Sequence, residues 1–191
     1  MGRDKATLAW NGMTLLEHQA GILRRAGASQ LLLSGRSDRS EGLADFGWVK
    51  DSEAGAGPAA ALADAWREAN SDVLVALAID LPDMPPDYLR DLAMGALQQE
   101  RSVVPVLGGR YEPLAAAWHR SAVPDFFDTA GRSLQGICTI LAKRDLLTVR
   151  EVSDGEARLF ENINTPDDYV RLGAGASLAR RISSDRPTQR P

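Results

Sequence analysis

An unbroken apolar segment, residues 73–79, constrains the fold of this chain more than any other feature. Seven apolar residues in a row indicate a β-strand that is covered on both faces. The segment is far shorter than the roughly 20 residues needed to cross a bilayer, and Asp80-Leu81-Pro82 ends it. The sequence therefore predicts a strand in the interior of a sheet, with helices on both sides of that sheet.

Helix and strand signals alternate along the rest of the chain. Thr14 and Glu17 form a capping-box signature before an amphipathic segment that Gly27 ends, which predicts a helix between them. Further helices are expected at residues 58–66, after 85–86, at 123–129 and 134–143, and after 165–166, and further strands at 31–33, 46–50, 103–107, 114–118, 149–152 and 158–160. This order predicts a three-layer α/β architecture, a mostly parallel sheet with helices on both faces.

Charge and length describe one domain with a polar tail. The 191 residues suffice for a single sizeable core, and the formal net charge is −4. Residues 1–172 are expected to form the domain. Residues 173–191 are expected to form a disordered tail, because Gly, Ser, Arg and Pro dominate there. Four Arg and one Asp in that tail leave a charge of −7 on the remainder, which disfavours nucleic acid as a partner. Without an apolar block near its start, the chain is expected to be cytoplasmic, with no membrane contact.

Cysteine and histidine, the usual ligands of zinc, are scarce in this chain. Cys138 is the only cysteine, and His18 and His119 are the only histidines, so neither a disulfide framework nor a Cys/His zinc site is expected. None of these three side chains is assigned a role, and Cys138 is expected in the core. Any metal must be held by carboxylates.

Polar residues directly after the apolar strands are the first site candidates. In open α/β sheets, ligands bind outside the carboxyl ends of the strands, which points to Ser34, Asp51 and Asp80. Asp80 is a natural ligand for Mg²⁺, which uses one or two carboxylates together with water and phosphate oxygens. The competing interpretation of each residue is a turn or a helix cap. Gly57 and Pro58 likewise fit either an anion-binding loop or a tight connection.

Three further residues have chemistry suited to a nucleotide-like substrate. Lys5 is one of three lysines against nineteen arginines, and its ammonium can neutralise a phosphate, although an exposed lysine often serves only solubility. Asn162 and Asn164 flank Ile163, so both amides are expected to point the same way and could bind a heterocycle. They could equally hold the turn before the helix start at Thr165 and Pro166.

Four blocks of the sequence resemble the nucleotidyltransferases that attach a nucleotide to molybdopterin, most closely the molybdenum cofactor guanylyltransferases. Residues 1–5, MGRDK, are similar to the end of that family's opening motif. The later blocks follow in order: Asp51 with Gly57-Pro58, residues 80–82 (DLP) and residues 162–166 (NINTP). The resemblance covers residues 1–172 and implies a Rossmann-like nucleotidyltransferase fold.

The resemblance also implies roles for these residues. Lys5 and Asp51 would contact GTP, with Ser34 at a nucleotide-contacting position where well-known members have Asn. Asp80 would hold Mg²⁺, and Lys5 and Asp80 would be the catalytic residues. Asn162 and Asn164 would lie on the molybdopterin side. The implied reaction transfers GMP from GTP to molybdopterin and releases pyrophosphate, and proteins that deliver molybdopterin or accept the finished cofactor would be partners.

The chain departs from the family at its start. The family's first strand, interior to the sheet, and its glycine-rich loop would precede Met1 and are missing from this sequence. We therefore hypothesise that translation begins upstream, and we expect little GTP turnover from the 191-residue chain. Two alternatives remain open at this point: a cytidylyltransferase of the same family, and a non-catalytic protein that binds molybdopterin or a partner.

Overall fold

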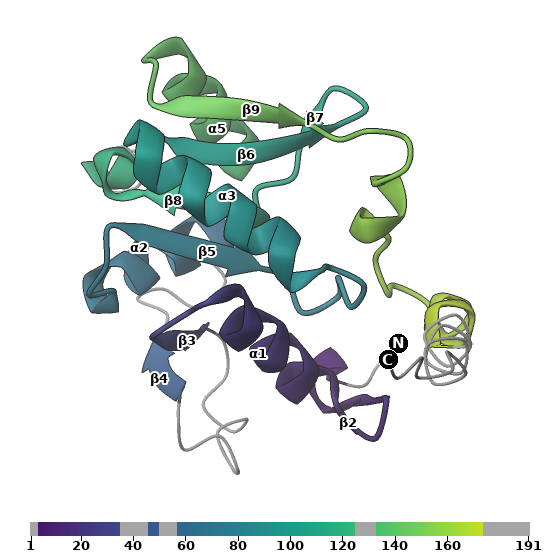
Figure 1. Cartoon of the computed structure of the whole chain (residues 1–191). Coiled ribbons are helices and arrows are strands. Elements are labelled where there is room, and N and C mark those ends of the chain that lie inside the picture. The colour runs from purple at the N-terminus through teal and green to yellow at the C-terminus, as the bar shows by residue number, and fades with distance from the viewer. Residues whose placement is uncertain (1–3, 35–45, 50–56, 125–132, 174–191) are drawn as a thin grey trace, which may run out of the picture.

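The computed structural model describes residues 4–34, 46–49, 57–124 and 133–173 (Figure 1). Asp51, one of the residues expected to contact the nucleotide, lies outside these ranges, and so does most of the helix expected at 123–129. In the described part, no helix is both long enough and apolar enough to span a membrane.

A five-stranded sheet forms the centre of the molecule. Its strands are β5 (Val73–Leu77), β6 (Ser102–Leu107), β7 (Arg110–Tyr111), β8 (Ala115–His119) and β9 (Leu147–Glu151). They are hydrogen-bonded in the order β5-β8-β6-β7, and β9 pairs in parallel with β6. β8 lies antiparallel between β5 and β6, so the sheet is mixed, with β5, β6 and β9 pointing the same way. The strand predicted in the interior of the sheet is β5, shortened to 73–77, and among the described strands it lies at an edge of this sheet rather than in its interior.

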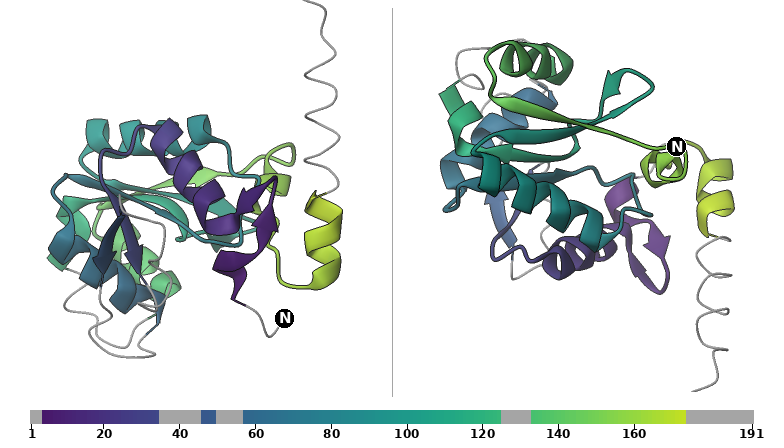
Figure 2. Two further views of the ribbon diagram at one scale, coloured as in Figure 1. Left: turned by 90° about the horizontal axis from the view of Figure 1, so that it is seen from below. Right: turned by 45° about the horizontal axis from the view of Figure 1, so that its top comes forward.

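Helices cover both faces of this sheet, as predicted (Figure 2). The helices α1 (Leu15–Ala26) and α3 (Pro86–Gln99) lie on one face, and α2 (Pro58–Glu68) and α5 (Leu134–Lys143) on the other. Two hydrophobic clusters correspond to these faces, one built on α3 and the other on α2 and α5. The three-layer α/β architecture is confirmed.

Adjacent residues in the central strands supply the two clusters alternately. Ala115 and Ala117 pack toward α3, whereas Ala116 and Trp118 pack toward α2 and α5. This is the period of two that a pleated strand imposes on its side chains. Both sets are fully buried, which explains why the strand sequence is apolar at every position rather than at alternate ones.

Local signals define the ends of the helices. The Thr14 and Glu17 side chains both make the predicted capping-box bonds at the start of α1, and Gly27 ends the helix in the left-handed conformation with φ 104°. Gly57, with φ 84°, precedes Pro58 in the first turn of α2. Before α1, Asn11 and Gly12, with φ of 52° and 84°, form the tight turn between β1 (Ala9–Trp10) and β2 (Met13–Thr14).

A separate two-stranded sheet lies beside β5. It consists of β3 (Leu31–Ser34) and β4 (Phe46–Val49), paired in parallel. Within the described residues, no strand links β3 to β5, and a cavity of about 500 Å³ lies between them.

One predicted strand is wrong. Residues 158–160 belong to a 3₁₀ helix, η4 (Ala157–Phe160), rather than to a strand. The cause is local, because Ser153 and Glu156 form a turn whose backbone bonds continue into the helix: Ala157 donates to Ser153 and Leu159 to Glu156. Three residues with one buried side chain, Phe160, gave no periodicity that could separate the two conformations.

Candidate active site

The Lys5 ammonium joins three distant parts of the chain. Its Nζ lies 3.0 Å from Asp80 Oδ2 and 2.9 Å from Asn164 Oδ1. The Lys5 and Asp80 side chains retain 27% and 24% of their exposure, so the pair is open to solvent on one side. A cation, a carboxylate and an amide, each predicted separately from the sequence, therefore meet at one accessible point.

Lys5 begins a short 3₁₀ helix, η1 (Lys5–Thr7). The Asp4 carboxylate caps this turn by accepting the backbone N–H of Ala6 at 3.0 Å. The chain then continues to Leu8, whose carbonyl accepts the N–H of Leu15 at the start of α1 at 2.8 Å. These bonds fix the backbone that presents Lys5, so the position of its ammonium depends on the start of α1.

Asp80 lies in the loop that follows β5, and α1 holds this loop. The Gln19 side-chain amide donates to the carbonyl oxygens of Ala78 at 2.9 Å and Leu81 at 2.8 Å, on either side of Asp80. His18 Nε2 is 2.8 Å from the carbonyl oxygen of Pro82. Because Gln19 is only 4% exposed, this amide satisfies loop carbonyls that water reaches poorly.

The segment that carries Asn164 is tied to the same loop. The N–H of Ile163 donates to the carbonyl oxygen of Asp80 at 2.9 Å, and the Ile163 side chain is fully buried. Asn162 and Asn164, on either side of Ile163, are both exposed. The predicted arrangement, with both asparagines directed away from Ile163, agrees with this burial pattern.

A helix that begins at Pro166 anchors this segment from the other side. The N–H of Asp168 donates to Thr165 Oγ1 at 3.1 Å, which confirms Thr165 as the N-cap. The pKa of Asp168 lies below its usual value, because the Thr165 side chain and the backbone N–H groups of Thr165 and Asn164 bond to its carboxylate. The Asn164 backbone is thus held next to the helix start while its side chain reaches Lys5.

A small hydrophobic cluster packs beside the segments that carry Lys5 and Asn164. It consists of Trp10, Leu15, Ile163 and Leu172, which come from both ends of the described chain. The ring of Tyr169 meets Trp10 edge-on at 5.8 Å, and its hydroxyl donates to the carbonyl oxygen of Ala9. Packing of these residues holds the N-terminal turn and the C-terminal helix together, as required for Lys5 and Asn164 to meet.

The site suits a phosphate-bearing substrate and one divalent cation. In the described part of the chain, no three His, Cys, Asp or Glu residues form a cluster that could hold a metal by themselves. Asp80 with the amide oxygen of Asn164 offers the hard oxygen ligands that Mg²⁺ prefers. Because Mg²⁺ usually takes only one or two protein carboxylates and completes its shell with water and substrate phosphates, a single accessible aspartate fits such an ion.

Two other residues named from the sequence, Ser34 and Cys138, lie away from Lys5 and Asp80. Ser34 ends β3 and lines the cavity between β3 and β5, whereas Lys5 and Asp80 do not line that cavity. Cys138 is fully buried in α5, as predicted. No role was expected for His18, and Gln19 was not among the residues predicted to form a site. A signal for Gln19 was present, since it is a polar residue on the apolar stripe of a helix, three and four positions after Leu16 and Leu15.

Sequence comparisons with known proteins match most of the chain. The family model of the MobA-like NTP transferase domain matches residues 1–148. A relative from Opitutus terrae, named a probable molybdenum cofactor guanylyltransferase, is 29% identical over 177 residues, which cover 90% of this chain and 87% of that protein.

Solved structures show the same fold. Molybdopterin-guanine dinucleotide biosynthesis protein A from Archaeoglobus fulgidus is 26% identical, with a TM-score of 0.70 over 93% of this chain and 92% of its own. The 2-C-methyl-D-erythritol 4-phosphate cytidylyltransferase from Thermus thermophilus, 19% identical, has a TM-score of 0.68 over 91% of this chain and 94% of its own. This second likeness concerns the fold alone.

Proposed function

Because this chain belongs to the family of MobA-like NTP transferase domains, we propose that it transfers GMP from GTP to molybdopterin, with release of pyrophosphate. The chain is a nucleotidyltransferase, and the relative in Opitutus terrae carries the name of the proposed activity. The observation that supports the proposal most is the meeting of Lys5 with Asp80 and Asn164, residues 75 and 159 positions away in the sequence.

The reaction is a displacement at phosphorus. An oxygen of the molybdopterin phosphate attacks the α-phosphorus of GTP, a new P–O bond forms, and the bond to the β-phosphate oxygen breaks, so pyrophosphate leaves with the electron pair. Such a transfer needs little covalent chemistry from the protein. It needs the two reactants aligned and the phosphate charge neutralised.

Lys5 supplies the positive charge. Its ammonium has three donors and a flexible stem, so it can bond to phosphate oxygens of the bound nucleotide while Asp80 and Asn164 keep it directed into the site. In the substrate complex, the charge on Lys5 stabilises the oxygens on which negative charge increases as the bond to pyrophosphate breaks.

Asp80 is the proposed ligand of Mg²⁺. When bound, Mg²⁺ would neutralise phosphate charge and help to orient the triphosphate. The task of the protein is to keep the Asp80 carboxylate at a fixed point, and the bonds from Gln19 and Ile163 to the backbone around Asp80 do so. Asp80 therefore has a positioned backbone and an accessible carboxylate, both of which a metal ligand needs.

The remaining roles follow from the resemblance. Asp51 and Ser34 are proposed to contact GTP. Asn162 and Asn164 are proposed to face molybdopterin, which would place Asn164 between Lys5 and the acceptor substrate. The proposed partners are GTP, molybdopterin, and the proteins that deliver molybdopterin or receive the product.

Isothermal calorimetry tests the choice of nucleotide and the role of Lys5. We expect Mg–GTP to bind the chain more tightly than Mg–CTP, and Lys5→Ala to weaken Mg–GTP binding by about tenfold or more, since one charge-assisted contact is lost. Lys143→Ala, at the end of α5, is the matched control and should bind as the unmodified chain does. Tighter binding of Mg–CTP, or equal binding by Lys5→Ala, would contradict the proposal.

A further inference from the structure

The Lys5 ammonium lies between the two oxygen atoms that best suit a divalent ion. Its Nζ is 3.0 Å from Asp80 Oδ2 and 2.9 Å from Asn164 Oδ1. A carboxylate oxygen and an amide oxygen are hard ligands of the kind that Mg²⁺ and Mn²⁺ bind. In this structure, a cation of the protein itself therefore uses the ligands that a bare divalent ion would need.

The backbone around Lys5 keeps this ammonium in the site. The N–H of Leu8 donates to the carbonyl oxygen of Lys5 at 3.2 Å, and the N–H of Ala6 donates to the Asp4 carboxylate at 3.0 Å. These bonds fix the start of the side chain, while its four-carbon stem can still rotate. The ammonium can thus turn from one acceptor to another, but its charge stays near Asp80.

A bare divalent ion and the Lys5 ammonium oppose each other at this point. To bind Asp80, the ion must either displace the ammonium from the two oxygens or lie beside it. Displacement breaks two hydrogen bonds of a charged donor. Binding beside the ammonium brings positive charges together where the side chains are only about a quarter exposed, so water screens them incompletely. Either arrangement weakens the binding of the bare ion.

The complex of the ion with a nucleoside triphosphate experiences the opposite effect. A triphosphate carries more negative charge than one divalent ion neutralises, so the complex is negative overall and is attracted to Lys5. Its phosphate oxygens also offer the ammonium new acceptors in exchange for those that the metal takes. The same lysine therefore disfavours the bare ion and favours the ion that arrives with a triphosphate.

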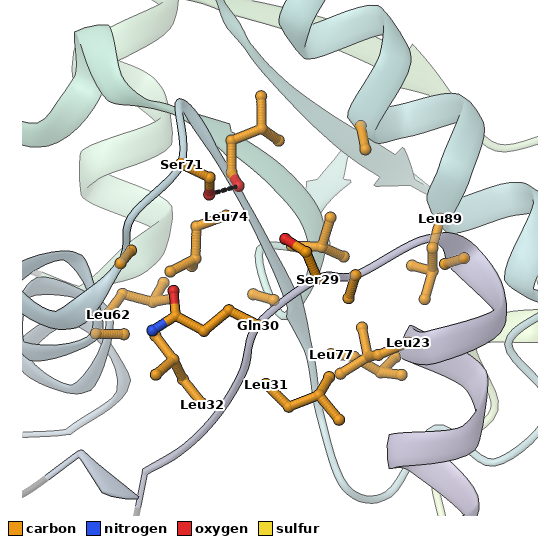
Figure 3. Close-up of a pocket in the computed structure, with 18 of the residues that line it drawn as sticks. Leu23, Ser29, Gln30, Leu31, Leu32, Leu62, Ser71, Leu74, Leu77 and Leu89 are labelled. Carbon is orange, nitrogen blue, oxygen red and sulfur yellow. Dashed lines mark hydrogen bonds between the residues drawn. The ribbon is translucent and has the colours of Figure 1, made fainter. Parts of the chain in front are cut away.

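Asp80 is the acidic group at which a bare ion would meet Lys5. Close to the site in the sequence, Asp4 and Asp168 use their carboxylates to accept backbone N–H groups. The cavity between β3 and β5 is lined mainly by apolar side chains (Figure 3), which cannot replace the water around an ion. Among the described residues, no cluster of three His, Cys, Asp or Glu side chains offers the ion another place.

We propose that Lys5 excludes the bare divalent ion from Asp80 in the free protein, so that the metal enters the site together with the triphosphate. Lys5 thereby sets the order in which metal and nucleotide bind, in addition to contacting phosphate. This inference deepens the proposed function and rests on it, because Asp80 is the metal ligand proposed there.

Titration with Mn²⁺ in the absence of nucleotide tests the proposal. Mn²⁺ takes the same oxygen ligands, and the electron paramagnetic resonance signal of the free ion measures how much is bound. Lys5→Met removes the charge but keeps a long side chain, and loss of one partly exposed ion pair costs little stability. We expect Lys5→Met to bind Mn²⁺ about tenfold or more tightly than the unmodified chain does.

Three further variants identify the cause and the place of this effect. Lys5→Arg keeps the positive charge and should bind Mn²⁺ as weakly as the unmodified chain does. Lys143→Met removes the same charge in the last turn of α5 and should leave the Mn²⁺ affinity unchanged. Lys5→Met combined with Asp80→Asn should lose the gained affinity, because the carboxylate that binds the ion is absent.

Three results would overturn the proposal. The first is equal Mn²⁺ affinity of Lys5→Met and the unmodified chain, including binding too weak to measure in both. The second is binding by Lys5→Arg as tight as by Lys5→Met, since the charge would then not be the cause. The third is a gain in affinity that persists when Asp80→Asn is added, because the ion would then bind elsewhere.

The sign of the effect separates this inference from the proposed function. The proposed function predicts that loss of Lys5 weakens the binding of Mg–GTP, whereas the inference predicts that the same loss strengthens the binding of bare Mn²⁺. If Mg–GTP does not bind while the Mn²⁺ affinities change as expected, the proposed function fails and the exclusion of the bare ion stands. If Lys5→Met weakens Mg–GTP binding but leaves the Mn²⁺ affinity unchanged, only the inference fails.

Discussion

The Lys5 ammonium has three donors, and Asp80 and Asn164 accept two of them. Asn164 therefore has a role that the family resemblance did not imply, since it contacts the residue proposed to bind phosphate as well as facing the proposed acceptor side. The amide fixes the direction of the lysine without adding a second negative charge. A second carboxylate here would compete with the phosphates for the ammonium.

Asn164→Ala tests this role at the residue scale. Loss of one hydrogen bond to a charged, partly exposed donor is worth about 1 kcal/mol, so we expect Mg–GTP affinity to fall about fivefold. The measurement is calorimetric titration with Mg–GTP and, separately, with molybdopterin. If only molybdopterin binding weakens, Asn164 does not position Lys5.

The carboxyl group of Glu156 leads to a prediction about the pH dependence of stability. Glu156 accepts hydrogen bonds from the Arg150 side chain and from the backbone and hydroxyl of Ser153, which lower its pKa from 4.5 to about 2. A lowered pKa in the folded state stabilises the protein fully above about pH 4.5, and this contribution is lost as the pH falls from 4.5 to 2.

Carboxyl NMR titration checks this value directly. We expect the Glu156 carboxyl to titrate near pH 2 in the unmodified chain, and its pKa to rise toward 4.5 in Arg150→Met, where the largest cause of the shift is removed. An unchanged pKa in Arg150→Met would refute the assignment of the shift to Arg150.

At the scale of elements, the position of the loop after β5 depends on α1, a helix that lies some sixty residues earlier in the sequence. Gln19 and His18 of α1 bond to backbone carbonyls of this loop, while Ile163 bonds to it from the opposite end of the chain. The candidate site is therefore formed where three elements converge, and no single loop contains it.

Gln19→Leu removes the central contact. The carbonyl oxygens of Ala78 and Leu81 would lose a buried donor, which costs about 1–3 kcal/mol of unfolding free energy. Urea denaturation measures the loss, with Gln98→Leu on the exposed side of α3 as the control for the change of side chain. Equal stability of the two variants would show that Gln19 does not hold the loop.

The sequence predicted most elements because their signals are local. Continuous apolar runs marked β3 and β5, and the capping box with Gly27 marked α1. The antiparallel direction of β8 could not be predicted, since neither composition nor length distinguishes an antiparallel strand inside a buried sheet. The contact between Lys5 and Asp80 depends on how the two ends of the described chain pack together, and the spacing of residues in the sequence does not reveal that packing. Only the family resemblance assigned both residues to one site.

At the scale of the whole molecule, the buried thiol of Cys138 reports on global unfolding. Burial raises the pKa of Cys138 to about 12, and it lies in the cluster formed by α2, α5 and the sheet. We expect no reaction with a maleimide at pH 8 in native buffer and complete reaction at one thiol in guanidinium, because only unfolding exposes a reactive thiolate. Rapid labelling of the native protein would show that this cluster is open.

The proposed function depends on Asp80 as the acidic group that binds the metal–triphosphate complex. The most direct measurement is the calorimetric affinity for Mg–GTP of the unmodified chain, of Asp80→Asn, and of Asp87→Asn, the same change at an exposed position on α3. We predict that Asp80→Asn lowers this affinity about tenfold or more, while Asp87→Asn leaves it unchanged. Equal affinities of Asp80→Asn and the unmodified chain would contradict the role of Asp80 as the metal ligand.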